Sequence, residues 1–145
     1  MASVREQIVA GAVAALDATG KPGELTVHRS RTRAVENDLL PATAVYVVSE
    51  KVTRASHGRE VERKLRLRLE HRVSGEPVDA ALDPLLTWGT QAMLADATVQ
   101  GLPVVSVEEK ALEWDAAEVD RPYGACGQDF EITYYTAHDN PEESA

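Results

Sequence analysis

Hydrophobic positions near the start of the chain follow helical spacing. Apolar residues recur every three or four positions from Val4 to Leu16, which places them on one face of a helix. Ser3, followed three residues later by Glu6, is a capping box, a common signal of a helix N-terminus. The pattern therefore predicts a helix over residues 4–18, ended by the glycines and the proline that follow it.

Five segments have the patterns of β-strands: residues 25–28, 42–49, 59–73, 104–114 and 129–136. The segment 42–49 is apolar at successive positions, as in a strand covered on both faces, so it is predicted to lie in the middle of the sheet. In the segment 59–73, leucines and valines alternate with charged side chains, which predicts a long strand with one face exposed to water.

A second helix is predicted over residues 79–97, where leucines and a methionine form an apolar stripe. Pro84 leaves two possible starts, because a proline is tolerated in the first turn of a helix but not in its interior. The helix begins either near Asp79 or at Asp83, with Asp83 as the cap and Pro84 at the first position.

The remaining segments are polar connections and a tail. Residues 29–41 and 115–128 are predicted to be connecting loops, and residues 51–58 an extended polar hairpin. The segment 137–145 is acidic and is predicted to be disordered.

The predicted element order is therefore αβββαββ, in a single domain that covers residues 3–136. The simplest architecture that buries both helical stripes is of the α+β class. It has two helices packed on one face of a mainly antiparallel, mixed sheet of four to five strands.

Composition excludes several classes of protein. The chain has 145 residues, a net charge of -9 and one cysteine, Cys126. A single cysteine excludes an intramolecular disulfide and a cysteine-based zinc site, and the absence of a signal peptide at Met1 favours a reducing cytoplasm. The longest apolar stretch, from Ile8 to Leu16, is too short to span a bilayer, so no membrane partner is expected.

Charge is divided unevenly along the chain. Residues 1–75 contain 13 Lys and Arg against 9 Asp and Glu, whereas residues 76–145 contain 2 against 15. The acidic total argues against nucleic acid held by bulk electrostatics. The division would let a basic patch of one copy meet an acidic patch of the next, as in a head-to-tail ring, if the fold keeps the two apart. An acidic surface kept for solubility explains the second half equally well.

Motifs that carry catalysis are absent. The sequence has no glycine-rich phosphate loop, paired cysteines, HExxH or nucleophile elbow. The acidic runs at 108–109 and 113–115 are typical of a solvated strand edge. The histidines lie in different predicted segments without metal-ligand spacing; they are His28, His57, His71 and His138. We therefore expect no catalytic residue, cofactor or metal, and predict that the protein is not an enzyme.

Three charged regions are candidates for an interface. Alternating arginines at 29–33 could project together toward an anionic partner, although a solvated loop has the same pattern. The charged face of residues 59–73 and the predicted hairpin could likewise contact another subunit or face water. Together with acidic residues of the second half, the candidate interface residues are Arg29, Arg31, Arg33, Lys51, Arg54, Arg59, Lys64, Arg66, Arg68, Glu113, Asp115, Glu118 and Asp120.

Taken together, several segments resemble a family of small phage proteins. They are residues 4–9 (VREQIV), 26–31 (TVHRSR), 39–42 (LLPA), 63–70 (RKLRLRLE) and 79–86 (DAALDPLL). Over residues 3–136 the chain is similar to the tail terminator, or tail completion, proteins of long-tailed bacteriophages. The likeness lies in element order and general texture, because that family has no short diagnostic motif.

The resemblance implies a structural role without catalytic residues or cofactors. Such proteins form a ring, usually a hexamer, that caps the tail tube, ends its polymerisation and joins the tail to the head. The implied partners are other copies of the chain, the major tail tube protein and a head-tail connector protein, with DNA only passing through the ring. The implied location is the host cytoplasm during assembly, and then the virion tail.

Three alternatives remain. A different ring at the head-tail joint, such as a neck or head-closure protein, has a similar size and mixed secondary structure. A stand-alone bacterial binding or regulatory domain would be a stable monomer with a ligand pocket. A hydrolase or deaminase would have to gather its scattered Glu, His and Cys126 into one cleft.

Overall fold

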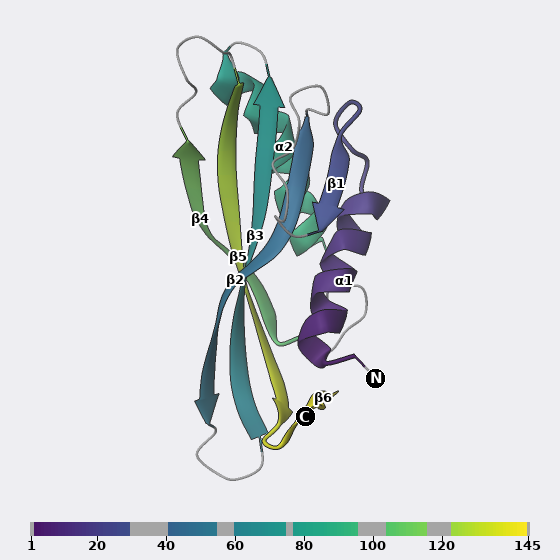
Figure 1. Cartoon of the computed structure of the whole chain (residues 1–145), viewed down its shortest axis with the longest axis vertical. Coiled ribbons are helices and arrows are strands. Elements are labelled where there is room, and N and C mark those ends of the chain that lie inside the picture. The colour runs from purple at the N-terminus through teal and green to yellow at the C-terminus, as the bar shows by residue number, and fades with distance from the viewer. Residues whose placement is uncertain are drawn as a thin grey trace.

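The computed structural model describes residues 2–29, 41–54, 60–74, 77–95, 104–115 and 123–144. The elements along the chain are α1 (Val4–Ala18), β1 (Thr26–Arg29), β2 (Ala42–Arg54), β3 (Glu60–Ser74), α2 (Val78–Leu94), β4 (Ser106–Asp115), β5 (Tyr123–Ala137) and β6 (Asn140–Ser144) (Figure 1). They confirm the α+β class and the predicted order αβββαββ, and add a sixth strand at its end.

The strands form one strongly twisted sheet (Figure 1). Its order is β1-β2-β3-β5-β4, and β6 pairs with the end of β5. β1 runs parallel to β2, whereas the other described pairs are antiparallel. The predicted mixed, mainly antiparallel sheet is therefore confirmed.

The core lies between the two helices and the central strands β3 and β5. Leu65, Leu67 and Leu69 of β3 are fully buried, as are Phe130 and Ile132 of β5, which pair with them across the sheet or lie beside them. Each strand alternates sides at every residue, so these side chains share the face that the helices cover. Neither helix in the described part of the chain is long and apolar enough to cross a membrane.

Helix α1 has the predicted bounds and the predicted cap. The Oγ atom of Ser3 accepts a hydrogen bond from the backbone N–H of Glu6 at 3.1 Å. The side chain therefore satisfies one of the backbone donors that a helix N-terminus leaves without a partner.

Helix α2 corrects the alternative start at Asp83. It begins at Val78, before Asp79 as well, and contains Pro84 in its interior. The backbone N–H of Ala81 already donates to the carbonyl of Pro77 at 3.1 Å, so the first turn is formed well before the proline. Burial of the leucine stripe outweighs the hydrogen bond that Pro84 cannot donate. The helix ends at Leu94, and residues 96–97 lie outside the described part of the chain.

Two predicted connections are partly strand. β2 continues to Arg54, through the first residues of the predicted hairpin 51–58, and its pairing with β3 shifts register between Val47 and Ser49. β5 begins at Tyr123, so residues 123–128 are not part of a loop. This stretch was missed because it contains two glycines and an alanine, whose small side chains give no apolar alternation.

The prediction of a disordered tail over residues 137–145 is wrong for most of that segment. Residues 140–144 form β6, which pairs Asn140 with Ala137 and Ser144 with Thr136 of β5. The side chain of Asn140 accepts a hydrogen bond from the backbone N–H of Glu142 at 3.0 Å. Backbone pairing and this local hydrogen bond order a polar segment that brings little apolar surface of its own.

Gly89 allows α2 to approach the sheet at the position of Gln128. A Cβ atom at residue 89 would overlap Gln128 Oε1 and lie 3.3 Å from Leu69 Cδ2. Gln128 is fully buried, and its Oε1 accepts a hydrogen bond from His71 Nε2 at 2.8 Å. The side chain of Gln128 therefore cannot move aside without losing hydrogen bonds in a buried site.

We expect Gly89→Ala to lower the free energy of unfolding by about 1–2 kcal/mol, because overpacking outweighs the better helix propensity of alanine. Urea unfolding followed by circular dichroism measures the change. Gly20→Ala is the matched control, since a Cβ there meets no atom within 4 Å. Equal stability of the Gly89→Ala variant and the wild type would contradict the close approach.

Candidate functional site

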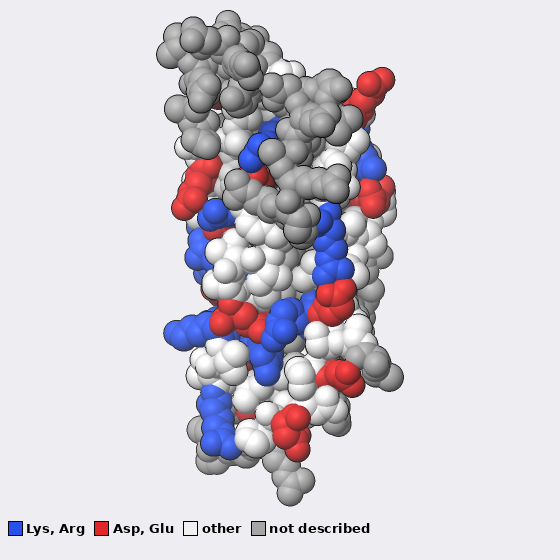
Figure 2. Space-filling model, in the orientation of Figure 1, with Lys and Arg blue, Asp and Glu red and all other residues white. Residues whose placement is uncertain are grey.

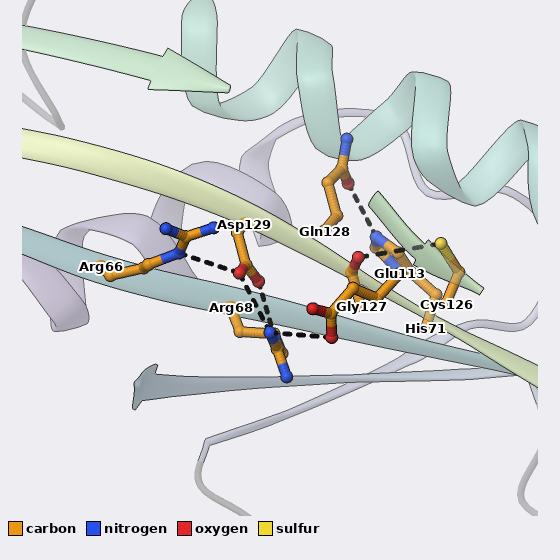
Figure 3. A network of polar contacts seen from close by, with 8 residues as sticks. All are labelled: Arg66, Arg68, His71, Glu113, Cys126, Gly127, Gln128 and Asp129. Carbon is orange, nitrogen blue, oxygen red and sulfur yellow. Dashed lines mark hydrogen bonds and ion pairs between the residues drawn. The ribbon is translucent and has the colours of Figure 1, made fainter. Parts of the chain in front are cut away.

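The sheet face away from the helices carries a cluster of ion pairs around Asp129 of β5 (Figure 3). Arg68 Nε donates to Asp129 Oδ1 at 2.6 Å and Arg66 Nε donates to Oδ2 at 2.9 Å. Arg68 Nη2 donates to Oδ2 at 3.0 Å and also lies 3.2 Å from Glu113 Oε2 of β4. The cluster therefore joins β3, β5 and β4 across their strand pairing.

The Asp129 carboxylate is buried beneath these arginines. Its side chain is 1% exposed, whereas those of Arg66 and Arg68 are 37% and 22% exposed. Burial alone would raise the pKa of Asp129, but the hydrogen bonds from Arg68 and Arg66 outweigh it, and the pKa lies below its ordinary value. The hydrogen bond to Asp129 likewise raises the pKa of Arg68. Both partners therefore stay charged at neutral pH.

A second cluster lies on the helix side of the sheet, around Glu50 of β2. Arg5 of α1 donates to Glu50 Oε2 from Nε at 2.8 Å, and Arg63 Nη1 of β3 donates to the same oxygen at 3.3 Å. The Tyr134 hydroxyl donates to Glu50 Oε1, and burial together with this carboxylate raises the pKa of Tyr134. The cluster fixes the N-terminal end of α1 to three strands.

Both clusters are suited to holding strands in place. In the first cluster, the hydrogen bonds from the two arginines lower the pKa of Asp129, so this carboxylate is a weak base and is not poised for proton transfer. Among the described residues, no group of three His, Cys, Asp or Glu could hold a metal ion. Cys126 is buried, and burial raises the pKa of its thiol. His71 is buried in the core, where it contacts Gln128 and Thr43.

The uneven charge along the sequence becomes a gradient across the sheet. Strands β1, β2 and β3 come from the basic half of the chain, and β5 and β4 come from the acidic half. Because these two groups occupy opposite sides of the sheet, the two halves meet at the contact between β3 and β5. Pairing of Arg66 and Arg68 with Asp129 is the local result of that contact.

Within the described residues, the outer side of the short strand β1, the end of β2 and the outer side of β4 have no strand neighbour. β1 pairs only with residues 42–45, which leaves β2 open along residues 46–54. On the other side of the sheet, β4 pairs with β5 alone. Figure 1 shows the end of β2 extending beyond α1 at the lower end of the molecule, and β4 along the border of its upper half.

The open stretch of β2 is basic and apolar. Lys51 and Arg54 are exposed, and beside them Val48 and Val52 are 42% and 52% exposed. In Figure 2 a group of Lys and Arg side chains lies at the lower left of the molecule, over the end of β2 in Figure 1. We call residues 46–54 the β2 edge.

The open edge of β4 is acidic and apolar. The side chains of Glu108 and Glu113 are 56% and 68% exposed, and Leu112 and Trp114 are 42% and 53% exposed. Lys110, 2.7 Å from Glu108, is the only basic residue of the strand. Trp114 also lines an open hollow of about 580 Å³ at the start of α2, together with Asp79, Ala80 and Asp83. We call residues 106–115 the β4 edge.

The structure brings together some of the predicted interface residues. Arg66, Arg68 and Glu113 meet in the Asp129 cluster, so their strongest contacts lie within one chain. Arg29 contacts Glu6 of α1, and Lys64 lies 4.0 Å from Glu62. Lys51 and Arg54 belong to the β2 edge and Asp115 ends β4. Outside the described residues lie Arg31, Arg33, Arg59, Glu118 and Asp120.

Sequence reasoning missed Asp129, Glu50 and Trp114. Asp129 and Glu50 look like ordinary polar positions of alternating strands, and only the register of β5 on β3 and the position of α1 bring arginines to them. Trp114 could have been found from the sequence, because a tryptophan at the acidic end of a predicted strand is a large apolar group among polar residues and indicates an interaction surface.

Comparisons with known proteins add no relative: no protein-family model matches the sequence, and no curated protein matches it either.

Proposed function

We propose that the protein is a tail terminator: a structural subunit that forms a ring on the tip of a phage tail tube, ends the polymerisation of the tube and offers a surface for joining the head. The observation that carries the proposal is the pair of unlike open edges on one sheet. A closed ring of identical subunits needs two different surfaces that complement each other, one on each side of every subunit.

The fold supports this proposal in a second way. The element order on which the resemblance to tail terminators rests is the order of the structure, with β6 as an addition. The ion-pair clusters around Asp129 and Glu50 brace a long, twisted sheet from both faces, which suits a subunit that must keep its shape while its edges are engaged. An acidic chain with a net charge of -9 would also let DNA pass without adhering to the ring.

Tube polymerisation in the presence of the protein tests this function. The major tail tube protein of the same phage or prophage is polymerised with and without the protein, and electron microscopy measures tube length and the occupancy of tube tips. We expect short tubes with a ring at one tip. Tubes of unlimited length without any attached protein would contradict termination. Rings bound only to a head-tail connector protein would favour a neck or head-closure protein instead.

A further inference from the structure

We infer that the β2 edge of one copy pairs with the β4 edge of the next, so that adjacent subunits share one continuous antiparallel sheet. The inference rests on the proposed ring and names the contact between its subunits. It follows from the direction, charge and apolar content of the two edges.

Strand direction favours this contact. β2 is antiparallel to β3, β3 to β5 and β5 to β4, so β2 and β4 run in opposite directions within one subunit. When the next copy continues the sheet in the same orientation, its β2 edge lies antiparallel to the β4 edge of the first. Backbone N–H and C=O groups on the sides of these strands that have no strand neighbour among the described residues can then form a regular ladder.

Charge selects which edges meet. The β4 edge has four acidic residues against one lysine, so two β4 edges would bring like charge together across a strand pair, which is destabilising, even though Glu108 and Glu113 have Lys110 and Arg68 as neighbours. Two β2 edges would oppose Lys51 and Arg54 in the same way, because Glu50 in that stretch is already held by Arg5, Arg63 and Tyr134. Each edge therefore repels its own kind and attracts the other, which favours a contact between unlike edges over a two-fold dimer through either edge.

Apolar side chains supply attraction that charge alone would not. Exposed ion pairs contribute little affinity but give orientation, whereas burial of apolar surface stabilises a contact. Val48 and Val52 lie on the β2 edge, and Leu112 and Trp114 lie on the β4 edge. An edge strand that carries large exposed apolar side chains is a site of association unless something covers it.

The β2 edge and the β4 edge of one subunit cannot pair with each other. β3 and β5 lie between β2 and β4 in the strand order, and strands in a sheet are about 4.8 Å apart. The contact must therefore be made between copies. Because it joins two different surfaces, it propagates head to tail and closes into a ring when the rotation between copies allows it.

Exchange of charge between the edges tests the inference. One variant, Lys51→Glu with Arg54→Glu, makes the β2 edge acidic, and a second, Glu108→Lys with Glu113→Lys, makes the β4 edge basic. Analytical ultracentrifugation of concentrated protein and electron microscopy of tube tips measure self-association. Alone, each variant carries two edges of the same sign, and we expect its self-association to weaken by about tenfold or more.

An equal mixture of the two variants should assemble again, because each edge of one then meets an edge of opposite sign on the other. Lys21→Glu is the control for a distant change of charge, because Lys21 lies after α1 and pairs with Asp17. Because Glu113 also contacts Arg68, thermal unfolding checks that each variant is folded, and Glu108→Lys alone replaces the second variant if it is not.

The outcomes separate this inference from the proposed function. Restored assembly in the mixture supports the edge contact. Single variants that assemble like the wild type, a mixture that stays dissociated, or a wild type that never self-associates either in solution or on tubes would each overturn it. If rings still end the tubes while the charge exchange leaves self-association unchanged, the contact between the β2 and β4 edges is contradicted and tail termination is not. If the variants dissociate alone and assemble in the mixture but tubes grow without limit, tail termination is contradicted and the edge contact is not.

Discussion

Between pH 7 and pH 4 the wild-type protein should lose about 3 kcal/mol more of its free energy of unfolding than a His71→Gln variant does. The reason is the burial of His71, which is 0% exposed. Burial lowers the pKa of His71 to about 4, and the hydrogen bond to Gln128 opposes this only in part. In the unfolded chain the pKa returns to about 6.5.

The direction of the change in stability with pH depends on whether the folded or the unfolded state of the protein binds the proton of His71. Between pH 6.5 and 4 the imidazole is protonated in the unfolded chain but neutral in the folded one. The unfolded state then binds more protons, so stability falls as the pH falls through this window. Above pH 6.5 both states are neutral and the contribution of the buried histidine is fully present.

The hydrogen-bond partners of His71 explain why its neutral form is favoured in the folded state. His71 Nε2 donates to Gln128 Oε1, and the Thr43 hydroxyl, 2.8 Å away, donates a hydrogen bond to Nδ1. Gln128 in turn donates from Nε2 to the carbonyl of Leu86 and to Thr90. A neutral imidazole with its proton on Nε2 therefore satisfies its neighbours, whereas a charged one would be buried without a carboxylate partner.

Urea unfolding at steps between pH 7 and pH 4 measures this difference. His71→Gln keeps a polar side chain but does not titrate, so the difference between the two pH dependences isolates the histidine. His28→Gln is the control, because His28 lies on the edge strand β1 and is only partly buried. Parallel pH dependences of wild type and His71→Gln would show that His71 is not buried as a neutral group.

The order of elements could be predicted because each long element has a strong period. Alternation in β3 and the apolar face of α1 are local patterns, and both appear in the structure nearly as expected. The first six residues of β5 could not be found in this way, because their place in the sheet comes from pairing with β3 and not from their own side chains. β6 is similar, since it is ordered by its contact with β5.

The candidate site, like the fold, could be predicted only in part from the sequence. The sequence contains the charge difference between the two halves of the chain, and the arginines of β3 were expected at an interface. It could not show that Arg66 and Arg68 are occupied by Asp129, because that depends on the register of strands more than fifty residues apart. Lys51 and Arg54 were proposed for the same role, and the structure places them on an open edge.

Asp129→Asn should lower the free energy of unfolding at pH 7 by about 2–3 kcal/mol. The carboxylate accepts three hydrogen bonds from two arginines, and hydrogen bonds to charged groups stabilise a fold by about 1.5–3 kcal/mol. Asparagine keeps one acceptor oxygen but turns an NH₂ group toward a guanidinium, where donor meets donor. The loss stays below that of a fully buried ion pair, since Arg66 and Arg68 keep contact with water.

The pH dependence of this variant distinguishes the ion pair from simple packing. The pKa of Asp129 in the folded state lies below its ordinary value, so its contribution is present above about pH 4 and fades as the pH falls through the folded-state pKa. The gap in stability between wild type and Asp129→Asn should therefore narrow in acid. Glu131→Gln is the matched control on the same strand and face, since Glu131 lies 4.0 Å from Lys110 and a change there should cost less than about 0.5 kcal/mol. A stability difference that stays constant down to acid pH would mean that Asp129 stabilises the fold by packing and not by its charge. The ion pairs of Asp129 with Arg66 and Arg68 would then not be what stabilises the contact between β3 and β5.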